Sequence, residues 1–270
     1  MARLICLILH LPVNTIPMNW IGFYTLLHRE TYRFTRLFRQ TIIPPLITTL
    51  LFILIFGFSL GSNIREIHGF SYIIFIIPGL AQNGILTNAY ANSSTSLFMA
   101  RLERSIENLL IAPLSYAHIV LAFILGAVLR GLTIGYATLL VSSFFYDFPM
   151  PHPFLLFCSW TLSSALFGAL GLMSALLAET WDHIALFTNF VITPFIYLGG
   201  TFYSINMLPG FWRKASYFNP IFYCIDSTRF AMLGVSDVPA VYSFVLIATL
   251  TILSIAACTL MVKKGYKLVH

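Results

Sequence analysis

Long apolar runs separated by short polar segments dominate the pattern of hydrophobic and polar positions along the chain. A helix needs about 20 mostly apolar residues to cross the hydrocarbon core of a bilayer. The runs that reach or approach this length lie at residues 42–60, 72–91, 119–145, 154–178, 184–198 and 241–262. The pattern therefore predicts an all-α integral membrane protein with six transmembrane helices.

Ahead of the first run, residues 20–40 carry a helical pattern with two different faces. Aromatic and aliphatic side chains recur on one face, and Arg29, Arg33 and Arg36 fall on the opposite face. A helix of this kind is typical of the membrane interface. We therefore expect an N-terminal amphipathic interfacial helix. The alternative, a helix packed on a soluble partner, is weaker because the first apolar run follows directly.

Residues 1–17 precede this helix and fit no clear element. Arg3 and the apolar stretch after it imitate a signal peptide, but the stretch is short and no small-residue cleavage site follows. We expect either a genuine extension or a start site placed too far upstream. Residues 18–270 would then form one transmembrane domain.

The segment between the fifth and sixth runs is rich in aromatic residues and is interrupted by proline. Non-helical backbone at membrane depth survives only where protein or water covers it, so we expect a re-entrant external hairpin of two short helices. Asp226 and Arg229 lie three apart, which lets them pair or brace the neighbouring span. A gate and a passive interfacial anchor both fit this pattern. The candidate hairpin residues are Tyr203, Pro209, Asn219, Pro220, Asp226 and Arg229, with Asn219-Pro220 setting the turn.

Residues 98–113, between the second and third runs, have the pattern of a short charged helix that ends before Pro113. Taken alone, such a helix is most often a solvated surface element. Its tight placement between two spans also makes it a suitable handle for a cytosolic partner. Its charged candidate residues are Arg101, Glu103, Arg104 and Glu107.

Composition and charge support the membrane assignment. Hydrophobic residues make up 59% of the chain and charged residues 9%, whereas a soluble domain carries roughly 25% charged residues. The net charge of +6 comes from lysines and arginines that flank the apolar runs, so it does not indicate nucleic-acid binding. Ten of the fifteen basic residues fall on the side that holds both termini and four on the other, which predicts cytosolic termini.

Missing motifs limit the chemistry. No Gly-Lys dipeptide is present, so the chain has no phosphate-binding P-loop, and the common zinc patterns are absent too. None of the nine acidic residues falls well inside a predicted span, which argues against a secondary, ion-coupled transporter. A membrane-bound lipid-modifying enzyme, the other alternative, would need clustered catalytic groups. We therefore expect no catalytic residue, no metal and no cofactor bound by this chain.

Among the polar residues inside predicted spans, Arg130 and Asn88 stand out. Arg130 lies near the centre of the third span, where a charge must pair, reach the interface or meet water. Pairing with a carbonyl or with Asp226 and contact with a substrate are both open. Asn88 in the second span is expected to form a hydrogen bond between helices rather than to recognise a substrate.

The external segment contains Phe202, Leu208-Pro209, Asn219-Pro220, Arg229 and Gly234 in that order. Earlier motifs are Pro78-Gly79-Leu, Thr87-Asn88-Ala-Tyr90-Ala-Asn92 and Thr193-Pro-Phe-Ile-Tyr-Leu-Gly-Gly. Together with the six-run topology and the N-terminal helix, these motifs resemble the ABC-2 family of ABC-transporter permeases, and within it the YadH-type inner-membrane permeases. The likeness extends from about Met18 to the C-terminus.

The resemblance implies a homodimeric permease in the bacterial cytoplasmic membrane, bound to two copies of a separate ABC ATPase that holds ATP-Mg. It also implies that the helix at residues 101–110 docks into the ATPase and that the interfacial helix adds to this contact. Export would run between the two protomers. Lipids, glycans and drug-like compounds all occur among the substrates of the family.

Overall fold

The computed structural model describes residues 19–59 and 66–265. These residues form helices and no β-strand, with one isolated bridge between Ile67 and Phe70, so the all-α prediction is confirmed. Residues 1–17 lie outside the described residues. The elements are α2 (Trp20–Arg36), α3 (Phe38–Phe52), η2 (Ile53–Ser59), α4 (Tyr72–Leu102), α5 (Ser105–Ile111), α6 (Tyr116–Ser143), α7 (Pro153–Leu177), α8 (Trp181–Phe187), η3 (Thr188–Ile192), α9 (Thr193–Leu198), η4 (Ile205–Met207), α10 (Gly210–Tyr217), α11 (Pro220–Leu233) and α12 (Ala240–Lys263).

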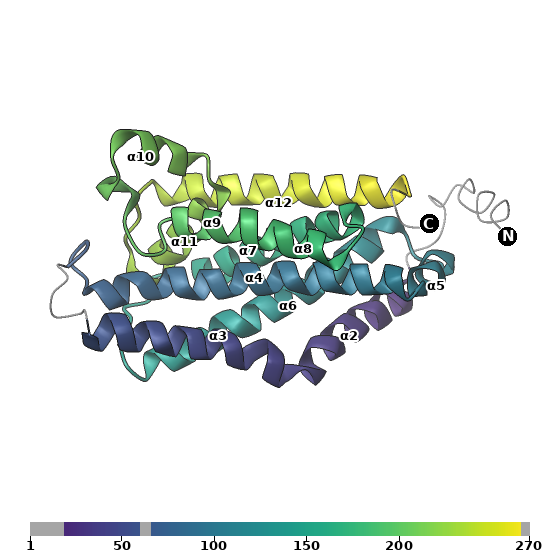
Figure 1. Cartoon of the computed structure of the whole chain (residues 1–270), viewed down its shortest axis with the longest axis horizontal. Coiled ribbons are helices and arrows are strands. Elements are labelled where there is room, and N and C mark those ends of the chain that lie inside the picture. The colour runs from purple at the N-terminus through teal and green to yellow at the C-terminus, as the bar shows by residue number, and fades with distance from the viewer. Residues whose placement is uncertain (1–18, 60–65, 266–270) are drawn as a thin grey trace.

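The long helices run along one axis and make an elongated bundle (Figure 1). α4, α6 and α7 form its centre, and small residues let their backbones approach closely. A Cβ at Gly171 of α7 would lie 2.5 Å from the carbonyl oxygen of Tyr90 in α4, and a Cβ at Gly168 would lie 2.8 Å from the Cβ of Ala127 in α6. The bundle centre is therefore packed at a density that only glycine permits at these positions.

Five of the described helices are long and apolar enough to cross a membrane: α3 with the turn after it (Phe38–Gly57), α4, α6, α7 and α12. They match five of the six predicted runs. The remaining run, 184–198, falls in three short consecutive pieces, α8, η3 and α9. η3 is a π-helical turn with a local cause. Pro194 cannot donate a helical hydrogen bond, and the Thr193 hydroxyl donates to the Thr188 carbonyl, 3.0 Å away.

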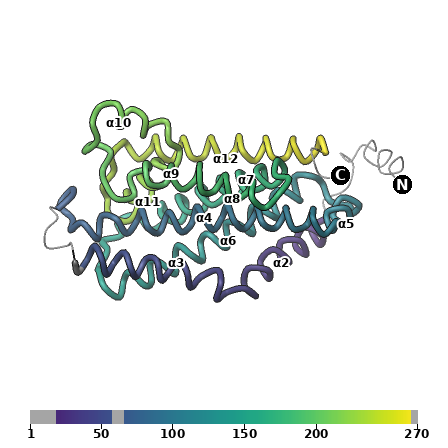
Figure 2. The backbone as a smooth tube through the Cα atoms, viewed as in Figure 1, coloured from purple at the N-terminus to yellow at the C-terminus, as the bar shows by residue number. Residues whose placement is uncertain are grey.

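The two ends of the bundle differ. α5, the first residues of α2 and the last residues of α12 lie at one end, and η4, α10 and the start of α4 lie at the other (Figure 2). We call these the α5 end and the α10 end. The pattern at residues 98–113 predicted one short charged helix. In the structure this segment is instead divided between the end of α4 and α5. α4 continues to Leu102, and Arg104 takes a left-handed φ of 57° before α5 begins.

Candidate functional site

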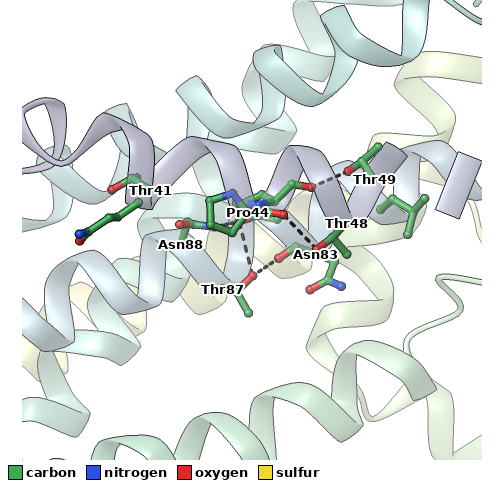
Figure 3. Close-up of a pocket in the computed structure, with 11 residues that line it drawn as sticks. Thr41, Pro44, Thr48, Thr49, Asn83, Thr87 and Asn88 are labelled. Carbon is green, nitrogen blue, oxygen red and sulfur yellow. Dashed lines mark hydrogen bonds between the residues drawn. The ribbon is translucent and has the colours of Figure 1, made fainter. Parts of the chain in front are cut away.

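A polar groove of about 330 Å³ separates α3 from α4, two of the helices long enough to cross a membrane. Figure 3 shows Thr48 of α3 facing Asn83 and Thr87 of α4 across it. Polar groups at this depth are costly unless they have partners or a function. The residues that line this α3–α4 groove are Gln40, Thr41, Pro44, Pro45, Thr48, Thr49, Leu80, Asn83, Gly84, Thr87 and Asn88.

The α3 side of the groove is lined by amide and hydroxyl side chains and by two adjacent prolines. Pro44 and Pro45 lie inside the helix and have no backbone N–H, so the carbonyl groups of Gln40 and Thr41 lose their usual helical partners. The hydroxyl of Thr48 donates to the Pro44 carbonyl at 3.0 Å. α3 therefore presents hydrogen-bond acceptors to the groove, although most of its other side chains are apolar.

On the α4 side, Asn88 links the groove to Arg130 of α6. The Asn88 amide donates to the Gly84 carbonyl at 3.0 Å, and its oxygen accepts a 2.9 Å bond from Nη2 of Arg130. Of the partners considered from the sequence, Asp226 is not the one used, because its carboxylate bonds elsewhere. The two intramembrane polar residues singled out in the sequence thus contact each other.

One turn further toward the α5 end, α2 is fastened to α4 by ionic side chains. Nη2 of Arg33 donates to the carbonyl and side-chain oxygens of Asn92, at 2.8 and 3.1 Å. Glu30, whose side chain is 1% exposed, lies 3.3 Å from Arg33 and accepts a 2.7 Å bond from Ser96. Burial lowers the pKa of Arg33, and the Glu30 carboxylate counteracts this effect.

The packing of α2 refines the two-faced pattern. Leu26, Glu30 and Phe34 are its buried residues, and a Cβ at Gly126 of α6 would meet the Cβ of Glu30 at 2.9 Å. Of the three arginines expected on the polar face, Arg36 is exposed, Arg29 pairs with Glu30 at 3.2 Å, and Arg33 reaches into the bundle. Glu30 was not among the residues predicted from the sequence. Its one signal was an acidic residue placed one and three residues from arginines.

A second polar cluster lies at the α10 end, around Asp237. Its carboxylate, 1% exposed, lies 3.5 Å from Nη1 of Arg229 and 3.6 Å from His68, and it accepts a 3.2 Å bond from the Ile205 backbone. Arg229 also donates to the Gly200 carbonyl at 2.6 Å, and its guanidinium lies 4.0 Å from the centre of a phenylalanine ring, that of Phe75. We call this the Asp237 cluster. Asp237 was not among the candidate residues.

The remaining candidate residues of this segment have structural contacts. Asn219 caps α11 through the Ile221 N–H at 3.0 Å and donates to the Phe195 carbonyl at 2.6 Å, and Pro220 is the first residue of α11. Asp226 accepts bonds from the Asp237 N–H at 2.7 Å and from Ser243 of α12 at 2.9 Å. Pro209 precedes α10, and burial raises the pKa of the half-buried Tyr203.

Residues 21–233 match the sequence profile of the ABC-2 type transporter family. The chain belongs to this family. It is 39% identical over 248 residues to the inner membrane transport permease YadH of Escherichia coli. The aligned region covers 92% of this chain and 97% of the relative. It is 25% identical over 225 residues to nodulation protein J of Sinorhizobium fredii, covering 83% and 84%. With its apolar helices, the chain is thus a multi-pass membrane protein related to transport permeases.

The charged residues predicted from the sequence to contact an ATPase lie at the α5 end. Glu103 and Arg104 are exposed at the turn between α4 and α5, and Glu107 is half-buried in the first turn of α5. Arg101 is held inward instead, because it donates to the carbonyl oxygens of Ala175 and Ala178, at 2.5 and 3.0 Å, where α7 ends. The structure brings the first three together and gives Arg101 a different neighbour.

Proposed function

We propose that this chain is the membrane-spanning subunit of an ATP-binding-cassette exporter. ATP-Mg is hydrolysed on a separate ABC ATPase, because the sequence has no phosphate-binding Gly-Lys dipeptide. Two copies of the chain and two ATPase subunits form the transporter, and a lipid-like, glycan or drug-like substrate leaves the cytoplasm. Family membership and the transport-permease relatives support this proposal.

The position of α5 is the observation that carries the proposal. α5 projects at the α5 end of the bundle beyond α4 (Figure 1). Its Ile106 side chain is 3% exposed and packs into the main core, so a push on α5 is transmitted to the spans. Exposed charges beside a firmly seated short helix suit contact with a cytosolic subunit that moves.

The proposal includes a sixth crossing made by α8, η3 and α9. Residues 181–198 stay helical in three pieces, and at about 1.5 Å per residue they span about 27 Å, close to the ~30 Å hydrocarbon core. Both termini then lie in the cytosol, on the side of the bacterial inner membrane that holds the α5 end. Reporter fusions at the C-terminus and near Ser236 should give signals from opposite compartments. Signals from the same compartment would contradict this topology.

The ATPase contact is tested by a double charge reversal, Arg104→Glu with Glu107→Arg, in the membrane-inserted chain. Each of these charges changes association by about 1 kcal/mol, so the double variant should lose most co-purifying ABC ATPase. Arg213→Glu, at an exposed position of α10 at the opposite end, is the matched control and should retain it. A double variant that binds its ATPase and transports normally would refute the coupling role.

For the segment at the α10 end, we propose a brace rather than a moving gate. The buried Arg229 and Asp226 tie α11 to neighbouring elements through several bonds, and a gate would have to break them on each cycle. A cysteine crosslink between α11 and α12 distinguishes the roles. A brace tolerates the crosslink, whereas a gate loses transport while ATPase binding persists and recovers it on reduction.

A further inference from the structure

Three buried N–H donors without an acceptor lie where α2, α4 and α6 meet. They are Nε of Arg33, Nδ2 of Asn92 and Nε of Arg130, and none has a hydrogen-bond partner among the described residues. A buried donor left unpaired costs about 1–3 kcal/mol, and more when it is charged. Because Asn88 and Asn92 lie one turn apart on α4 and each accepts a bond from one of the arginines, the three donors belong to one neighbourhood.

Positive charge exceeds negative charge where α2, α4 and α6 meet. Arg130 forms no ion pair within the described part of the chain, and the nearby charge that acts on it is the second guanidinium, that of Arg33. The one buried carboxylate close by, Glu30, is already engaged by Arg29, Arg33 and Ser96. An arginine within a membrane span without a counter-ion is costly, so an anion that supplies the missing charge would be held strongly.

The geometry of the donors favours one kind of anion. An arginine binds carboxylate or phosphate oxygens with two parallel bonds, and a phosphoryl group offers more acceptor sites than a carboxylate for donors that come from two arginines and an amide. The adjoining α3–α4 groove, lined by hydroxyls, amides and some apolar surface, gives room for the rest of an amphiphilic molecule beside Asn88.

We propose that the polar cluster of Arg33, Asn92 and Arg130, which adjoins the α3–α4 groove at Asn88, binds the phosphoryl group of an anionic amphiphile. This inference rests on the proposed function and deepens it, since it gives the exported substrate a phosphate ester. Lipid-linked phosphates and phospholipids share this chemistry. The phosphoryl group sits at the end of the groove nearest α2, and the apolar part extends along α3.

The test uses the full-length chain purified in neutral detergent without any ATPase, so absence of an ATPase partner cannot affect it. The measured quantity is the Kd of dioleoyl phosphatidic acid. Arg130→Gln should weaken binding about ten- to one-hundred-fold, the effect of losing a charge-assisted hydrogen bond. Arg36→Gln changes the net charge equally at an exposed position of α2 and should stay within about twofold. Arg130→Lys keeps the charge but not the fork and should fall between the two.

Three probes identify the ligand. Dioleoylglycerol, with the same tails and no phosphate, should bind at least about tenfold more weakly, and so should oleate, which carries a carboxylate. Inorganic phosphate binding as tightly as phosphatidic acid would point to a soluble phosphate ester and overturn the assignment to an amphiphile, whereas weaker binding would support it. Equal Kd values for Arg130→Gln and Arg36→Gln, or tight binding of dioleoylglycerol or oleate, would overturn the proposal. A rise in the Tm of the native chain with phosphatidic acid, absent in a folded Arg130→Gln, is a second readout.

Discussion

Two arginines buried in the same bundle, Arg229 and Arg130, have very different surroundings. Arg229 is 1% exposed and has a carboxylate 3.5 Å away, a carbonyl at 2.6 Å and an aromatic ring beneath it. Arg130 is less completely buried and has a single hydrogen bond, to a neutral amide, with no carboxylate among its described neighbours. Arg229 is therefore paired with a carboxylate within the protein, although its Nε and Nη1 make no hydrogen bond to a described residue, and this ion pair serves the fold. Arg130, which has no such carboxylate partner among the described residues, fits the proposed role of binding an anionic ligand.

The largest expected effect separates these two roles at the Asp237 cluster. Asp237→Ala leaves Arg229 buried without its counter-ion and should lower the free energy of unfolding by about 3–5 kcal/mol. We expect poor yield and a Tm lowered by many degrees in detergent. The exposed Asp147→Ala is the control and should behave as the native chain does. A normal Tm for Asp237→Ala would show that the cluster does not stabilise the fold.

A second, smaller effect is expected on the pH dependence of stability, at Asp226 beside the Asp237 cluster. Burial raises the pKa of Asp226 to about 6, against the bonds from Asp237 and Ser243 and the nearby Arg229, which lower it. Because the pKa of the folded state is raised, the stabilising contribution is fully present below pH 3.8 and is lost as the pH rises through about 6. A pKa difference of this size corresponds to about 2–3 kcal/mol.

Asp226→Asn keeps the shape of the protonated acid, so between pH 5 and pH 7.5 its stability should fall less than that of the native chain. The measurement is the unfolding free energy of both proteins at the two values. Asp147→Asn serves as a control that should follow the native profile. Parallel curves for the native chain and Asp226→Asn would contradict the assignment.

The sequence alone predicted the features that depend on residues close together in the chain, and it did not predict contacts between residues far apart in the chain. Long apolar runs are local features, and α4, α7 and α12 begin at or within one residue of the predicted starts at 72, 154 and 241. Asp237 gave no local signal and Glu30 only its neighbouring arginines, because the burial of each depends on partners far along the chain, such as His68 and Ser96. The Arg130–Asn88 contact joins two helices and was predictable only as two unusual polar residues.

A third prediction concerns the contact between α2 and α4. We expect that the specific bonds of Arg33, and not the positive charge of α2 as a whole, hold α2 in place. Arg33→Glu loses the bonds to Asn92 and places a second carboxylate beside Glu30, so it should cost about 2 kcal/mol and loosen α2. Arg36→Glu changes the same charge at an exposed position and should leave α2 in place. Hydrogen exchange of the α2 amides measures the difference. Equal exchange in both variants would mean that charge alone seats the helix in the membrane surface.

The smallest expected effect on stability is the one that most sharpens the comparison. Arg130→Gln removes an uncompensated charge and keeps a side chain that can donate to the Asn88 oxygen. Removing a buried, unpaired charge is often neutral or stabilising, so the unfolding free energy should change by less than about 1 kcal/mol, and any change should favour the folded state. Thermal unfolding beside the native chain and Asp237→Ala gives the answer. A loss as large as that of Asp237→Ala would mean that Arg130 serves the fold as Arg229 does, and a stable variant that no longer binds phosphatidic acid would assign its charge to the ligand.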